Sequence, residues 1–109
     1  MQGAAAAENK IFQALADPSR RAIFESLTRG EAAVKDLTSR FEISQPAVSQ
    51  HLAALKDAGL VNARREGRYI FYRVDPRGMK PLVDWIAHYR AFWTESVDRL
   101  EQLLEDMDE

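Results

Sequence analysis

Four short polar side chains within residues 45–51 are the groups in this chain best suited to specific recognition. They are Gln45, Ser49, Gln50 and His51. Amides and hydroxyls of this kind match the donors and acceptors on base edges in the DNA major groove, which admits one α-helix. Solvent-facing helix surfaces usually carry Glu and Lys instead, so the cluster indicates a surface that contacts something specific. On this segment alone, an ordinary amphipathic helix in a bundle explains the pattern equally well.

The helix that would carry this cluster has an apolar stripe and recognisable ends. The stripe repeats at i, i+4 and i+7 and consists of Val48, Leu52 and Leu55. Ser44 suits the N-cap position, Pro46 is tolerated in the first turn, and Gly59 suits the left-handed position after the last turn. The sequence therefore predicts a helix over residues 45–57, with one side in the core and a polar side outside it.

Length and residue types restrict the class of protein. With 109 residues, 46% of them hydrophobic, the chain suits one small globular domain whose core a partner can complete. The chain has no cysteine, which excludes disulfides, thiolate metal sites and cysteine nucleophiles. No apolar run approaches the ~20 residues that span a bilayer, and no charged-then-apolar leader opens the chain, so a cytoplasmic protein is expected.

The net charge of −2 is unevenly distributed along the chain. Residues 95–109 hold seven acidic side chains and one basic side chain, which leaves ten acidic and fourteen basic groups in residues 1–94, a formal charge of +4. Attraction to phosphate depends on where the charge lies, so the acidic pI does not argue against a nucleic-acid partner.

Three shorter helices are expected before the polar cluster. Residues 1–7 are predicted to be a disordered lead-in to a single domain over residues 8–109, and the first helix covers residues 8–16. Asp17 and Pro18 are a strong start signal for the second helix, as its N-cap and first helical residue. A third, short helix carries apolar residues at i, i+3 and i+7, which are Val34, Leu37 and Phe41.

The connection between the third helix and the polar one is short. Only residues 42–44 separate Phe41 from the helix over residues 45–57, and this spacing favours a helix-turn-helix. In that arrangement the first helix crosses the DNA backbone and the second enters the groove.

After Gly59 the pattern alternates, which predicts a hairpin that turns at Glu66-Gly67 and packs against the helices. One face is apolar and comprises Val61, Ala63, Ile70, Tyr72 and Val74. The other face comprises Arg64, Tyr69, Phe71 and Arg73, and the tip carries Arg65 and Arg68. Crowded arginines repel one another unless phosphates or a minor groove relieve them, so Arg64, Arg65 and Arg68 are predicted to form a DNA-contacting wing. The alternative is an ordinary solvated hairpin tip.

A long helix is expected over residues 79–106, after the break at Asp75-Pro76. It carries more apolar surface than so small a domain can cover, and large exposed patches of that kind mark interfaces. A second copy of the chain is the simplest cover, with the first helix packed alongside. The residues predicted at this dimer interface are Phe12, Leu15, Trp85, Tyr89, Phe92, Trp93 and Leu100.

The order of these motifs resembles the ArsR-type winged-helix repressors over roughly residues 8–104. The matching segments are ALADPSRRAIFESL (residues 14–27), ISQPAVSQHLAALKDAGL (43–60) and RREGRYIFYRV (64–74). The resemblance implies a mainly α fold with a small β-hairpin, namely a winged helix-turn-helix with five helices and a long C-terminal dimerisation helix. It also implies a homodimeric transcription factor that binds an imperfect palindrome in its promoter.

The chain departs from the metal-sensing members of that family. Where those members carry a Cys-x-Cys motif in the third helix, this chain reads Ala33-Val34-Lys35-Asp36-Leu37, so a thiolate site is excluded. A second family site uses Asp and His ligands on the last helix, where this chain has Asp84 and His88 at i, i+4. Further ligands are lacking, so no metal and no cofactor are expected, and the chain is assigned to the non-metal branch.

The resulting hypothesis is a sequence-specific repressor or autorepressor that binds double-stranded DNA at a pseudo-palindromic operator. Its predicted DNA-binding residues are Gln45, Pro46, Ser49, Gln50, His51, Lys56, Arg64, Arg65 and Arg68. Three alternatives stay open: a winged-helix module that binds protein, a repressor that responds to a small ligand held by the aromatic residues of the last helix, and one that responds to metal there. No phosphate loop, nucleophile–base constellation or paired acids are recognisable, so an enzyme is not expected.

Overall fold

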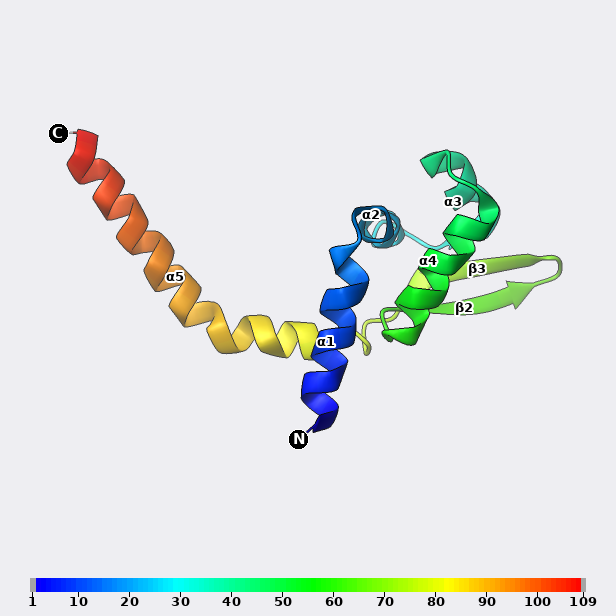
Figure 1. Cartoon of the computed structure of the whole chain (residues 1–109), viewed down its shortest axis with the longest axis horizontal. Coiled ribbons are helices and arrows are strands. Elements are labelled where there is room, and N and C mark those ends of the chain that lie inside the picture. Colours follow the sequence, from blue (N-terminus) through cyan, green and yellow to red (C-terminus); the bar gives the residue numbers. More distant parts are fainter. Residues whose placement is uncertain (1, 109) are drawn as a thin grey trace.

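The computed structural model describes residues 2–108, with side chains from residue 6 onward. The elements of this part, in chain order, are α1 (Gln2–Ala16), α2 (Pro18–Leu27), β1 (Ala32–Ala33), α3 (Val34–Phe41), α4 (Gln45–Asp57), β2 (Val61–Glu66), β3 (Tyr69–Val74) and α5 (Lys80–Asp108). The first four helices and the sheet form a body, from which α5 extends as a long arm (Figure 1). The predicted mainly α winged helix-turn-helix architecture is confirmed.

The core lies where the helices of the body meet the start of the hairpin. Its fully buried large side chains come from all four of these helices and the α4–β2 connection, and they are Ile11, Ile23, Leu37, Val48, Leu52, Leu55 and Leu60. The predicted stripe of α4 is among them, because Val48, Leu52 and Leu55 each have 0% exposure. Burial of this stripe fixes the rotation of α4 and leaves its opposite side outside the core.

The helix ends follow the predicted capping chemistry. Asp17 Oδ1 accepts a hydrogen bond from the Arg20 backbone N–H at 3.0 Å, and Ser44 Oγ accepts one from the Ala47 N–H at 3.2 Å. Both caps satisfy backbone donors that a helix start leaves unpaired. Gly59 has φ +81°, the left-handed conformation expected after the end of α4.

The turn between α3 and α4 rests on one strained residue. Glu42 has φ 53° and ψ 34°, and its N–H donates to the Thr38 carbonyl at 3.1 Å. A left-handed conformation is uncommon for a residue with a Cβ, and here it lets the chain reverse within residues 42–44. The tight connection expected of a helix-turn-helix is therefore present.

The hairpin register agrees with the predicted faces. Val61 pairs with Val74, Ala63 with Tyr72 and Arg65 with Ile70, so these six residues share one face. The strands are joined by Gly67 and Arg68, and Gly67 has φ +60°, which suits a glycine at the first central position of a tight hairpin turn.

Two features differ from the sequence-based expectation. The first helix begins at Gln2, six residues before the start at residue 8 expected from the sequence, and Met1 lies outside the described residues. Alanine has the highest helix propensity, and the run of alanines at positions 4–7 extends the helix toward the N-terminus. The second feature is a third strand, β1, which pairs antiparallel with β3 and gives the sheet order β1-β3-β2.

The arm is attached at its first turns only. Met79 and Leu82 pack against the core, and Phe12 of α1 meets Trp85 edge to face at a centroid distance of 5.3 Å. Beyond this contact α5 leaves the body, and none of its residues is buried. No helix within residues 2–108 is long and apolar enough to cross a membrane.

Candidate nucleic-acid interface

The exposed side of α4 presents the polar cluster that the sequence singled out. Gln45, Pro46, Ser49 and Gln50 are exposed in the first turns of the helix, and Lys56 is exposed near its end. They lie outside the core because Val48, Leu52 and Leu55 occupy the opposite side. This face can offer amide and hydroxyl groups to base edges, with a cation near the helix end for phosphate.

His51 differs from the rest of the cluster because it is only partly exposed. Its Nδ1 is buried, with no hydrogen-bond partner among the described residues. The pKa of Asp17 is lowered, first by the hydrogen bond from the Arg20 N–H and to a lesser extent by the nearby His51. His51 therefore lies on the side of α4 that approaches the start of α2, at the margin of the polar face.

A cleft of about 210 Å³ lies between α4 and the hairpin. Gln45 and Ser49 line it from α4, Arg68 lines it from the hairpin tip, and Lys35 lines it from α3. Two residues of the polar cluster and two cations thus border one cleft. Lys35 was not among the predicted DNA-binding residues. It lines the cleft because α3 packs against the sheet, and a local sequence pattern does not predict that packing.

The three predicted wing arginines lie in two different environments. Arg65 and Arg68 are exposed at the outer end of the hairpin. Within residues 2–108, no carboxylate lies within ion-pair distance of either guanidinium. Two cations at the tip are therefore available for an external anion.

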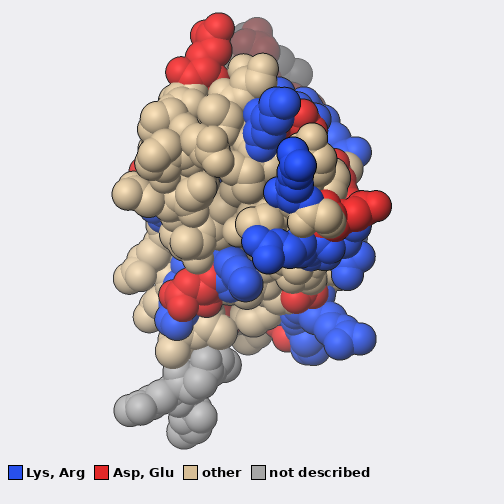
Figure 2. Space-filling view, turned by 90° about the vertical axis from the view of Figure 1, so that its right-hand side faces the viewer, with Lys and Arg blue, Asp and Glu red and all other residues tan. Residues whose placement is uncertain are grey.

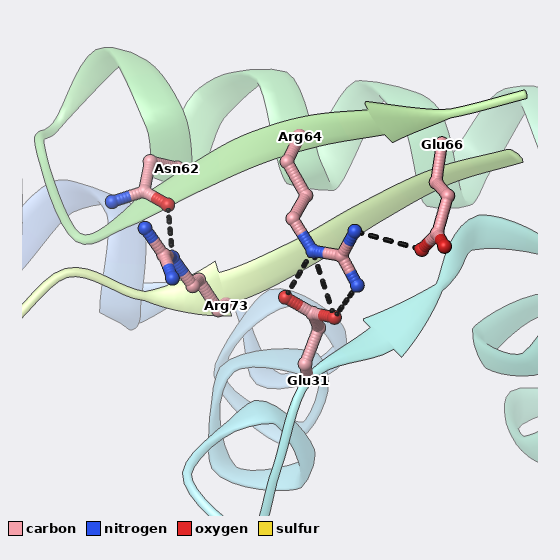
Figure 3. Close-up of polar contacts among 5 residues, drawn as sticks. All are labelled: Glu31, Asn62, Arg64, Glu66 and Arg73. Carbon is pink, nitrogen blue, oxygen red and sulfur yellow. Dashed lines mark hydrogen bonds and ion pairs between the residues drawn. The ribbon is translucent and has the colours of Figure 1, made fainter.

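Arg64 is instead held by two carboxylates on the other face of the hairpin (Figure 3). Its Nε donates to both Glu31 carboxylate oxygens, at 3.1 and 2.9 Å, and its Nη2 donates to Glu31 Oε1 at 2.6 Å. Its Nη1 donates to Glu66 Oε2 at 2.8 Å. The Arg64 guanidinium holds the pKa of the Glu31 carboxyl below its usual range.

Positive charge gathers on one part of the surface. Figure 2 looks onto the end of the body at which the hairpin turns, and there Lys and Arg side chains cluster over one half while the other half is mostly uncharged. Lys and Arg side chains gathered in this way can bind the phosphates of a DNA backbone.

The two candidate metal ligands on α5 are not joined by others. The Asp84 carboxylate pairs with Lys80 Nζ at 2.7 Å, and the His88 ring meets the Tyr89 ring at a centroid distance of 4.8 Å. In the described part of the chain, no group of three or more His, Cys, Asp or Glu side chains is placed to hold a metal ion.

Some of the residues predicted at the dimer interface pack against the body, and others are exposed to solvent. Leu15 packs against the core, and Trp85 is partly covered by Phe12. Four others on α5 are exposed by 39–59%, namely Tyr89, Phe92, Trp93 and Leu100. The apolar surface expected on the long helix is present, and in one chain it is uncovered.

Comparison with known proteins places this fold among bacterial regulators. The family model described as "Bacterial regulatory protein, arsR family" matches residues 17–63. A transcriptional regulator of Mycobacterium tuberculosis, Rv2034, is 41% identical over 97 residues, which cover 89% of this chain and 88% of that protein. The transcriptional repressor SdpR of Bacillus subtilis is 32% identical over 81 residues, covering 74% of this chain and 90% of the repressor.

A solved structure supports the same placement. An ArsR-like transcriptional regulator from Rhodococcus superposes with a TM-score of 0.73 at 29% identity, covering 93% of this chain and 95% of the other. The matched family segment begins at the α2 cap and ends within the hairpin, so it includes the whole helix-turn-helix. The chain belongs to the ArsR family and is a DNA-binding transcriptional regulator.

Proposed function

We propose that the chain is a homodimeric repressor that occupies a pseudo-palindromic operator in promoter DNA. The observation that carries this proposal is the exposed neutral face of α4, bordered by the cations Lys35 and Arg68 across one cleft. Each subunit inserts α4 into a major groove, with Gln45, Pro46, Ser49 and Gln50 toward the bases and His51 and Lys56 at the margins. Arg65 and Arg68 bind the phosphates or minor groove beside it.

A second copy of the chain is proposed to cover α5. The uncovered apolar surface runs from the Phe12–Trp85 contact along the arm, so an interface that begins beside α1 can continue over Tyr89, Phe92 and Leu100. A two-fold dimer places its two recognition helices about 34 Å apart, one turn of DNA. Repression follows from occupancy, since a protein bound across a promoter excludes other proteins from the same DNA.

Selection of bound sequences from a random pool of duplex DNA tests the proposal. The selected sequences are expected to share two inverted half-sites whose centres lie about one helical turn apart. Sedimentation of the pure protein should give the mass of two chains. A monomer that enriches no sequence would contradict the proposal and favour a winged-helix module that binds another protein through α5.

A further inference from the structure

The pairing of Arg64 with Glu31 spans the whole width of the sheet. Glu31 directly precedes the edge strand β1, and Arg64 lies on the opposite edge strand, β2. Phe71 of the central strand β3 pairs with Arg64 on one side and with Ala33, two residues after Glu31, on the other. The Arg64 guanidinium lies over the Phe71 ring at 4.7 Å, so its side chain crosses the central strand to reach Glu31.

The donors of Arg64 are already directed at protein oxygens. All three guanidinium nitrogens donate to carboxylates, and Phe71 covers one flat face of the group. A phosphate would have to displace a fork of charge-assisted hydrogen bonds, the strongest kind that arginine makes. On the same face, Arg73 makes one hydrogen bond, to the Asn62 amide oxygen at 2.9 Å.

The Arg64–Glu31 pair joins the wing to the helical body at a place where few backbone hydrogen bonds do so. β1 is two residues long and offers only two paired positions to β3. So short a strand pairing is marginal by itself. The Glu31 side chain retains 28% exposure and the Glu66 side chain 68%, so Glu31 is the better shielded partner.

We propose that Arg64 is a positioning residue: together with Glu31 it clasps the wing to the start of β1 and holds Arg65 and Arg68 where they meet DNA, and it does not itself bind phosphate. Glu31, on the far edge of the sheet, is then required for DNA binding although it is negatively charged. This inference rests on the proposed role of the wing in DNA binding.

Replacing Arg64 with lysine distinguishes a clasp from a phosphate contact. Lysine binds phosphate as a point charge but cannot fork two carboxylates or stack its charge flat on a ring. We expect Arg64→Lys and Arg64→Gln to weaken binding to the selected operator alike, by about three- to tenfold. Arg73→Lys, on the same face, is the matched control and should bind as the wild type does. Arg64→Lys with wild-type affinity would overturn the inference.

Neutralising Glu31 gives a second test in which the two explanations predict opposite signs. If Arg64 contacted DNA, Glu31→Gln would release it and remove a repelling charge, so binding would tighten. The clasp requires Glu31→Gln to weaken binding, with the double variant Arg64→Gln/Glu31→Gln no weaker than either single one. Asp36→Asn, an exposed acid of α3 outside the clasp, is the control and should bind at least as tightly as the wild type.

Two further measurements keep the outcomes distinct. Thermal unfolding of each variant shows whether the body is still folded at the binding temperature, and affinities are compared only below that transition. If the wild-type chain selects no DNA sequence, the proposed function fails. If it selects one and Glu31→Gln binds more tightly, only the clasp is refuted.

Discussion

The body and the arm of this molecule differ in whether their large apolar side chains are buried. In the body, the large side chains of α1–α4 that face inward are fully buried, among them Ile11, Ile23 and Leu52. Along α5 no residue is buried, and ten large apolar side chains are exposed. The body therefore folds around its own core, whereas the arm presents a surface that needs a partner. Under the proposed function, α4 depends on the body for its orientation and on the arm for its pairing with a second α4 in a dimer.

The largest expected effect comes from a charge placed in the middle of the arm. Phe92→Asp should abolish the dimer, because a buried unpaired carboxylate costs several kcal/mol at an interface. Sedimentation should then give a monomer, and affinity for a two-half-site operator should fall by roughly a hundredfold or more as the second contact is lost. Thr94→Asp carries the same new charge on the polar side of α5 and should stay dimeric. If the Phe92→Asp variant were still dimeric, the claim that the arm is covered by a second chain would be wrong.

A substitution that creates a cavity in the body should lower the stability of the fold and leave dimerisation unchanged. Leu52 is fully buried beneath the recognition face, so Leu52→Ala should lower the free energy of unfolding by about 2–5 kcal/mol. Denaturant unfolding measures this loss. Leu100→Ala removes as much of a side chain from the arm and, under conditions that keep the chain monomeric, should change stability by less than about 0.5 kcal/mol. Equal losses of unfolding free energy for Leu52→Ala and Leu100→Ala would contradict the difference between body and arm.

The wing tip should contribute charge without sequence preference. Arg68→Ala is expected to weaken binding to selected and random duplexes alike and to reduce the salt slope by about 0.9, the value for one phosphate contact. Titrations at several salt concentrations measure the slope. An unchanged slope would mean that the Arg68 side chain binds no phosphate.

The smallest expected effect is a pH dependence at the base of the wing. Arg64 lowers the pKa of Glu31, so their pairing stabilises the fold above the ordinary pKa of glutamate and is lost as the pH falls through the lowered value. The difference in Tm between the wild type and Glu31→Gln should therefore be present near neutral pH and disappear in acid. Asp17 also has a lowered pKa, but it is common to both proteins and cancels in the difference. A Tm difference that persists in strong acid would exclude the pairing as its source.

Local patterns in the sequence predicted the elements that carry recognition. The capping residues Asp17 and Ser44, the apolar stripe of α4 and the faces of the hairpin are all set by neighbours within a few positions, and the structure confirms them. The assignment of single residues to DNA or to the dimer stays a prediction.

Contacts between residues far apart in the sequence could not be predicted from those local patterns. β1 has two residues, too few to show alternation, and Arg64 and Glu31 are 33 positions apart. From the sequence, Arg64 is predicted to contact DNA together with Arg65 and Arg68. Only the packing of the sheet separates it from them. Lys35 enters the cleft for the same reason, because the distance from α3 to the wing is a tertiary property.

The most direct test of base reading by α4 is a comparison of Gln50→Ala with the wild type on the selected operator, on its single-base variants and on random DNA. An amide can bond bidentately to adenine, so the substitution should cost about 1–3 kcal/mol on the operator and relax the preference at one position in each half-site. Binding to random DNA should stay the same. An equal loss on operator and random DNA would contradict the claim that α4 reads sequence through Gln50.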